Sequence, residues 1–310
     1  MMKKILPILV SLVVSLGALE ESDLIWQTGP SVQEYHSALQ QAIVNKEWWS
    51  VVDYAQIISY NFPTSPFAKE ASYIMGEAYY KLNQFEYAND CFTAYLNHTT
   101  SPKHFEEAIE YKFNIAEKFS SGTKKKLFGS PKFPAWVDAT EDSVEIYDEV
   151  IAALPHSEMA AKSLLSKARI LVEIEDFKVG LEALDLLIRR FPKHDFAAQA
   201  YLEKNHVYFT QCQQESLDPD LLDLAFVNLR KFRQVFPREP RIAEAEQVYA
   251  DMQELFAQNL FETGCFFEKT KKVPASMIYY SKVVAKYPNT IAAVASREKL
   301  EQLQAASRAD

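Results

Sequence analysis

Two histidine and glutamate pairs have the spacing that could hold a metal ion. His104 and Glu107 stand three positions apart, as do Glu203 and His206, so each pair would share one face of a helix. A zinc site needs at least three protein ligands, and each pair is alone in its segment. We therefore interpret these histidines as solvated or packed side chains, and we expect no metal and no cofactor.

The remaining reactive side chains do not form a catalytic constellation. The sequence has no GxSxG, no phosphate-binding glycine loop and no GxGxxG, and only 7 of its 310 residues are glycine. Its cysteines, Cys91, Cys212 and Cys265, lack the spacing of a metal or redox motif. We interpret them as partly buried thiols, with a disulfide between Cys212 and Cys265 as the alternative in an oxidising compartment. The sequence thus predicts a protein that is not an enzyme.

A cluster of tyrosines and charged residues has the composition of a protein-binding surface. Its members follow one another at helical spacing and are Glu70, Tyr73, Glu77, Tyr80 and Lys81. Tyrosine offers a large rigid contact area and a hydrogen-bonding tip, which suits the binding of an extended peptide. The alternative is that Tyr73 and Tyr80 pack against neighbouring helices as core residues.

A second candidate contact region combines lysines with large apolar residues. It contains Lys124, Lys125, Lys126 and Lys132, interleaved with Leu127, Phe128, Phe133 and Trp136. The simpler interpretation is a solvated lysine run, because loop lysines are normally exposed. In the alternative, Phe128 and Trp136 dock on a partner or on the protein itself, and the lysines face anionic lipid or an acidic surface.

The elements that position these residues are marked by a recurring helix end. An apolar residue followed by proline occurs five times, at Phe62-Pro63, Leu154-Pro155, Phe191-Pro192, Phe236-Pro237 and Tyr287-Pro288. Proline cannot continue a helix, so each pair predicts a helix terminus. Twelve positions before each proline stand Val51, Ser143, Gly180, Ala225 and Ser276, and Ala88 holds the equivalent place in a further unit. All of these except Val51 are small enough to let two helices approach closely.

Two stretches repeat a pattern of small and aromatic residues in full. They carry Gly76, Tyr79, Ala88 and Phe92 in one case, and Gly264, Phe267, Ser276, Tyr280 and Pro288 in the other. This is tetratricopeptide repeat spacing. We predict an all-α fold, a tetratricopeptide-like helical-hairpin solenoid of about five to six repeats with a C-terminal capping helix. That helix has an apolar edge of Ile291, Val294 and Leu303.

The predicted repeats fall into two groups. Residues 31–156 form the N-terminal repeats, in which the third unit is too long for one hairpin and carries a loop insertion at 120–138. Residues 157–310 form the C-terminal repeats and the capping helix, and they include an unusually long helix over 241–269.

The first residues have the pattern of an export signal. In residues 1–18, Lys3 and Lys4 precede an apolar run that is too short to be a permanent membrane anchor, so we predict a secretory signal peptide followed by a linker over 19–30. Leu19 stands where a bacterial lipoprotein would carry its lipid-bearing cysteine. The formal net charge of −9 argues against a nucleic-acid partner.

The chain resembles BamD-type proteins, the tetratricopeptide subunit of the machine that assembles β-barrels in the outer membrane. The similarity is strongest in LFETGCFFEKTKKVPASMIYYSKVVAKYPNT (260–290) and extends to GEAYYKLNQFEYANDCFTAYL (76–96) and ALPHSEMAAKS (153–163). It implies a periplasmic scaffold, peripheral at the inner face of the outer membrane. By position, N-terminal repeats with Tyr73, Glu77 and Tyr80 would bind unfolded outer-membrane protein segments. The last hairpin, around Tyr279, Tyr280 and Lys282, would hold the barrel subunit.

Two other functions fit a repeat fold of this kind. A periplasmic repeat adaptor could coordinate cell-wall synthesis with envelope constriction, although such adaptors often add an N-terminal coiled coil that this sequence lacks. A secretion-system chaperone or an accessory subunit of an envelope enzyme is the second alternative. A cytosolic chaperone would not need the export signal in residues 1–18.

Overall fold

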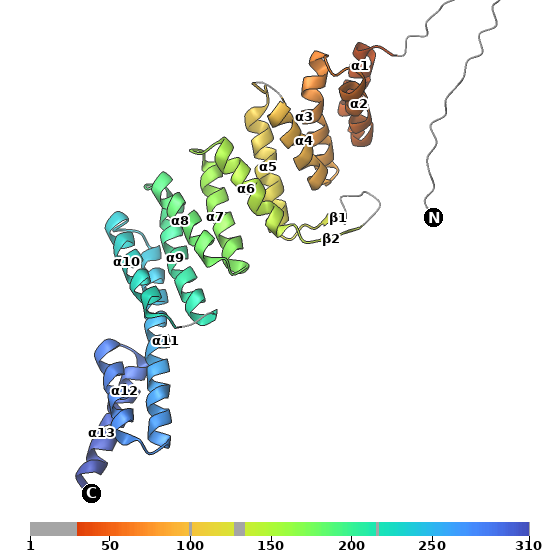
Figure 1. The fold of residues 1–310 in the computed structure, drawn as a ribbon. Helices are drawn as coiled ribbons and strands as arrows, with labels where there is room; N and C mark the ends of the chain where they lie inside the picture. Colours follow the sequence, from red (N-terminus) through yellow and green to blue (C-terminus); the bar gives the residue numbers. More distant parts are fainter. Residues whose placement is uncertain (1–29, 99–100, 127–133, 215–216, 310) are drawn as a thin grey trace, which may run out of the picture.

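The computed structural model describes residues 30–98, 101–126, 134–214 and 217–309, which form an elongated array of helical hairpins (Figure 1). The first helices of the six hairpins are α1 (Val32–Asn45), α3 (Pro66–Lys81), α5 (Phe105–Ser120), α7 (Glu158–Glu173), α9 (Asp195–Gln214) and α11 (Arg241–Lys269). The second helices are α2 (Trp48–Asn61), α4 (Phe85–His98), α6 (Thr140–Ala153), α8 (Phe177–Arg190), α10 (Pro219–Val235) and α12 (Val273–Lys286). The array closes with α13 (Ile291–Ala309), so the predicted helical solenoid is confirmed.

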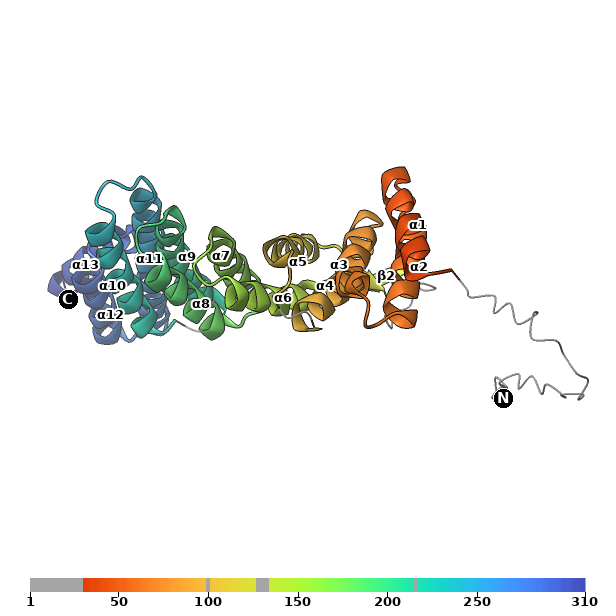
Figure 2. The same cartoon turned by 90° about the horizontal axis from the view of Figure 1, so that it is seen from above.

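Each hairpin packs mainly on its neighbours along the array, and α1 and α13 lie at opposite ends (Figure 2). The buried residues form clusters that overlap along the chain, one over α1–α3, one over α3–α9, one over α9–α11 and one over α9–α13. A hairpin of two amphipathic helices cannot bury its apolar surface alone, so stacking supplies the core of such a fold. This arrangement leaves long faces of the array open to partners.

All five helix ends predicted from the proline pairs are confirmed. The capping residues are Phe62, Leu154, Phe191, Phe236 and Tyr287, each directly before its proline. Their φ angles lie between −125° and −132°, because the proline ring pushes the preceding residue out of the helical region. Each of these residues still donates its N–H to the carbonyl four positions earlier, so the last helical hydrogen bond is kept.

Close helix contact at the small residues is also confirmed. The six positions found by counting back from the helix ends are buried. The rings of Phe92 and Tyr280 lie over Gly76 and Gly264, so closely that a Cβ on either glycine would stand 2.7 Å and 2.6 Å from a ring carbon. These distances are shorter than any normal carbon contact. The two glycines therefore set how near α3 lies to α4 and α11 to α12.

The short hairpin turns repeat one backbone conformation. Lys46, Asn83, Glu175 and Lys271 have φ angles of 59°, 55°, 64° and 59°, in the left-handed region. Each follows the first helix of its hairpin by one or two residues and reverses the chain before the second helix begins. The same turn in four hairpins indicates that they are copies of one unit.

The insertion between α5 and α6 contains a small sheet, which corrects the expectation of a plain loop over 120–138. Strand β1 (Lys125–Lys126) pairs antiparallel with β2 (Ala135–Val137). The Lys125 Nζ is 2.6 Å from the Asp142 carboxylate on α6, and the Lys126 Nζ donates to Gln84 before α4. These contacts hold the strands against the solenoid. The predicted contact residue Phe128, with Leu127, Lys132 and Phe133, lies outside the described residues.

The capping helix α13 leaves most of the apolar edge expected of it exposed, and only Leu303 of that edge is half-buried. Ile291 and Val294 are 79% and 51% exposed, and the helix packs through small residues on its other face, Ala292, Ala293 and Ser296. Small residues allow α13 to lie close to α11 and α12, whereas the larger side chains of Ile291 and Val294 point away from them. An apolar stripe thus remains uncovered at the end of the array.

None of the described helices combines the length and apolarity that crossing a membrane would require.

Candidate protein-binding surfaces

The tyrosine cluster on α3 joins two repeats, and its first tyrosine is a core residue. Tyr73 is 7% exposed and stacks on the ring of His104 with centroids 4.5 Å apart. Its hydroxyl donates to Glu77 at 3.2 Å. Tyr111 on α5 donates to the same carboxylate at 3.1 Å. The expectation that Tyr73 contacts a partner is therefore corrected, because its ring fills the space between α3, α4 and α5.

The other members of this cluster differ in how much surface they offer. Tyr80 is half-buried and packs edge-on against Tyr111 at 5.0 Å, and burial together with the Glu77 charge raises the pKa of Tyr111 to about 12. Glu70 accepts a hydrogen bond from Tyr95 at 3.4 Å and is partly exposed, and Lys81 is exposed. The surface available to a partner is thus the edge formed by Glu70, Tyr80 and Lys81.

Each of the two histidines lies beside a carboxylate of another helix. His104 lies 3.7 Å from Glu107 and also 3.7 Å from Glu70, which fixes the start of α5 on α3. His206 is 3.4 Å from Glu244 on α11. Its predicted partner Glu203 accepts from Arg169 instead. Across the described ranges, no group of three or more His, Cys, Asp and Glu residues could hold a metal.

A patch of aromatic and basic residues covers the last hairpin. We call it the C-terminal patch, and it consists of Phe266, Phe267, Ile278, Tyr279 and Lys282. Tyr279 stacks on Phe267 with centroids 5.3 Å apart, and the Lys282 Nζ lies 5.0 Å from the centre of the Tyr279 ring. Phe266 is 60% exposed and Ile278 is 55% exposed. Large apolar side chains beside a cation have the composition of a protein interface.

Tyr280, which was expected to be part of this contact, is buried. Its ring is fully covered and lies over Gly264. Its hydroxyl donates to the Glu268 carboxylate at 2.7 Å. Glu268 also receives the Lys299 ammonium of α13 at 3.0 Å. One carboxylate therefore holds α11, α12 and α13 together behind the C-terminal patch, and Tyr280 positions this patch from within.

This carboxylate makes the C-terminal end sensitive to acid. The Tyr280 hydroxyl, followed by Lys299, lowers the pKa of Glu268 below its ordinary value. Because the folded pKa lies below the unfolded pKa, Glu268 stabilises the fold at pH values above the unfolded pKa, and this stabilisation is lost as pH falls through the folded pKa. We expect Glu268→Gln to lower the melting temperature at pH 7 and to change it little at pH 3, in circular dichroism melts. An equal loss at both pH values would contradict this account.

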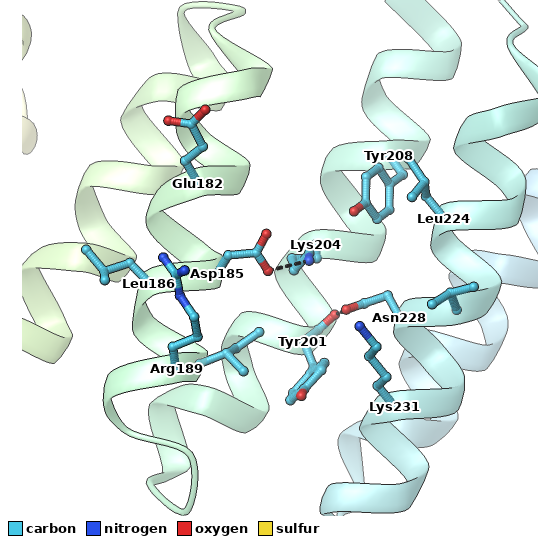
Figure 3. Close-up of a pocket in the computed structure, with 12 residues that line it drawn as sticks. Glu182, Asp185, Leu186, Arg189, Tyr201, Lys204, Tyr208, Leu224, Asn228 and Lys231 are labelled. Atoms are coloured by element: carbon cyan, nitrogen blue, oxygen red, sulfur yellow. Dashed lines mark hydrogen bonds and ion pairs between the residues drawn. The ribbon is translucent and has the colours of Figure 1, made fainter.

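The wall of the array also contains a groove that the sequence patterns did not indicate. It lies between α8 and α10, with α9 as its floor, and has a volume of about 730 Å³ (Figure 3). We call it the α8–α10 groove. Leu186, Leu224 and Val227 supply apolar surface, and the Lys204 Nζ meets Asp185 at 2.6 Å inside it. The available signal was the unusual apolar content of the exposed face of α10, where Leu224, Phe226, Val227 and Val235 are exposed.

Fold and surfaces define a tetratricopeptide solenoid, a class of proteins that bind other proteins along their open faces. A tetratricopeptide repeat model matches residues 70–98. The model of the YfiO family, described as outer membrane lipoprotein, matches residues 123–309, which is more than half of the chain. The protein therefore belongs to this family, and the resemblance to BamD-type proteins is confirmed.

Solved structures with similar repeats share little sequence with this chain. The tetratricopeptide protein YrrB, reported with an unusual peptide-binding site, is 12% identical, covers 70% of this chain and 92% of its own, and has a TM-score of 0.37. A repeat protein from Parabacteroides merdae is 12% identical over 89% of this chain and all of its own, with a TM-score of 0.36. MamA from Desulfovibrio magneticus is 16% identical, covers 68% of this chain and 98% of its own, and has a TM-score of 0.34. No curated protein sequence matches significantly.

Proposed function

We propose that this protein is a non-enzymatic scaffold of the machine that assembles β-barrel proteins in the outer membrane. The observation that carries the proposal is the YfiO family match over residues 123–309, a range that contains the entire C-terminal patch. In this proposal the protein lies at the periplasmic face of the outer membrane. The secretory signal predicted in residues 1–18 would deliver it there.

In this proposal the C-terminal patch holds the barrel subunit. Phe266 and Ile278 offer exposed apolar surface, the Tyr279 ring is stacked on Phe267, and the Lys282 ammonium lies over the Tyr279 ring. Aromatic residues positioned in advance make strong contacts because little side-chain entropy is lost when they bind. The patch is built on two packed helices, which gives a partner a defined surface.

The N-terminal repeats would bind unfolded outer-membrane protein segments. The surface assigned to this task is the edge of Glu70, Tyr80 and Lys81, together with Trp136 on β2, which is 70% exposed. Charged and aromatic side chains of this kind can contact an extended chain without selecting one sequence. The helices that carry the two surfaces, α3 on one side and α11 and α12 on the other, lie in separate parts of the array (Figure 1).

The test is the affinity of the purified protein for the periplasmic part of the barrel subunit. We expect Tyr279→Ala/Lys282→Glu to weaken binding about tenfold or more, since interface aromatic residues often contribute over 1 kcal/mol. The matched control, Tyr60→Ala/Lys69→Glu, changes the same residue types on exposed positions of the first repeats and should bind normally. Equal affinities for wild type and both variants, or an equal loss in both variants, would reject the C-terminal patch as the contact.

A further inference from the structure

The α8–α10 groove presents two cations that have no ion-pair partner in the described part of the chain. Arg189 on α8 and Lys231 on α10 line the same end of the groove, whereas the Lys204 charge is met by Asp185 (Figure 3). Leu224 lies seven residues before Lys231 on the same helix face. Along its length the groove therefore changes from apolar to positively charged within two helical turns, about 10 Å.

The uncovered face of α13 carries the complementary order of residues. Ile291 and Val294 are exposed, and Glu298 and Glu301 continue the same face of the helix. The two glutamates are exposed and form no ion pair within the described residues. Each apolar residue precedes its glutamate by seven positions, so this stripe changes from apolar to negatively charged over the same distance of about 10 Å.

From this match we propose that the α13 stripe of one copy of the protein docks in the α8–α10 groove of a second copy. With α13 parallel to α10, Ile291 and Val294 cover Leu224, and Glu298 and Glu301 reach Arg189 and Lys231. Apolar burial and charge pairing thus favour one orientation.

A helix suits this groove better than an extended chain. The walls and the floor are helices whose backbone groups are already paired, so they offer no edge to a strand. Asn228 on α10 is buried and uses its amide to donate to the Tyr201 carbonyl at 2.7 Å and to Asn205 at 2.8 Å. The backbone groups of a helix are already hydrogen-bonded to one another, so a helix needs only side-chain contacts with the groove.

The two contacting surfaces lie on different parts of one chain, so the association runs head to tail. A contact of this type leaves a free groove at one end of the assembly and a free α13 at the other, and it can extend into an open chain of copies. The proposal concerns other residues than the C-terminal patch. It can therefore fail while the proposed function holds, and the reverse is also true.

The experiment measures the mass of the full purified chain by sedimentation velocity over a range of concentrations. We expect the mass to increase with concentration, with a dissociation constant on the order of 100 µM or tighter, and to fall at high salt. Association should weaken about tenfold or more in each of two charge-reversal variants, Glu298→Lys/Glu301→Lys and Arg189→Glu/Lys231→Glu, when each is measured alone. An equal mixture of these two variants should restore association, because each groove then meets an oppositely charged stripe.

The matched control reverses two exposed glutamates elsewhere. Glu141→Lys/Glu145→Lys on α6 changes the net charge by the same amount as the α13 variant and should associate like the wild type. A wild-type protein that stays monomeric up to about 1 mM would overturn the proposal. Association that survives both charge reversals would also overturn it, as would a mixture that stays monomeric.

Discussion

Gly264→Leu should unfold the last hairpin and abolish binding at the C-terminal patch. A Cβ at this position would stand 2.6 Å from the Tyr280 ring, which is buried and held by Glu268. A larger side chain must either push the ring out or separate α11 from α12. We expect a loss of about 3 kcal/mol in the free energy of unfolding, measured by urea titration, which is the upper end of the usual cost of overpacking a core.

Alanine substitutions at the helical glycines provide a graded control. Gly264→Ala and Gly76→Ala both place a Cβ under 3.0 Å from a ring, whereas at Gly180 the nearest atom is 3.2 Å away. Alanine gains about 1 kcal/mol in helix propensity over glycine, which offsets part of the clash. Gly180→Ala should therefore be the least destabilising, and Tyr280→Leu should relieve Gly264→Ala. If all three alanine variants stabilised the fold, the close approach would not determine the packing.

Lys112→Glu should unfold the N-terminal repeats. The Lys112 side chain is fully buried, and its ammonium contacts Glu149 at 2.6 Å, Asn89 at 2.8 Å and Thr93. Burial lowers the pKa of this lysine, and the hydrogen bond and the charge of Glu149 act against that shift. A carboxylate in its place would face Glu149 without compensation. We expect a loss of about 3 to 5 kcal/mol, because a buried charge without a partner has costs of this order.

The location of this damage distinguishes it from general unfolding. Hydrogen exchange should show lost protection in α4, α5 and α6, while α11 to α13 stay protected, since a solenoid couples mainly nearest neighbours. The matched control is Lys112→Met, which keeps the buried chain length and removes the charge, and it should be much less destabilising. Equal destabilisation by Met and Glu would show that packing, and not charge, determines the effect.

Much of the fold could be predicted from the sequence because its signals are local. A proline fixes the backbone of the residue before it, so Phe191 and Tyr287 mark helix ends whatever surrounds them. The spacing from Gly264 to Tyr280 indicates a close helix pair, because an aromatic ring needs a small residue opposite. The long α11 followed from the absence of proline over residues 241–269.

The candidate surfaces were harder to predict, because helical spacing does not tell which face a neighbour covers. Tyr73 lies at helical spacing from the charged residues Glu70 and Glu77, and only the position of the next helix shows that it is a core residue. Ile291 and Val294 were expected to pack on the array and are exposed instead, because the close packing of Ala292 and Ala293 turns them outwards. The α8–α10 groove depends on how two helices separated by α9 are placed, so the apolar residues on the exposed face of α10 are its one local signal and do not show that a groove forms.

The length of α11 limits how the array can move. At 1.5 Å per residue its 29 residues form a rod about 44 Å long, which contacts α9 and α10 along one part and α12 and α13 along another. An unbroken helix bends only gently, so the last hairpin cannot swing on its own against the hairpin before it. A force applied at α12 is therefore transmitted through α11 to α9. Any bending of the array must then occur nearer its N-terminal hairpins.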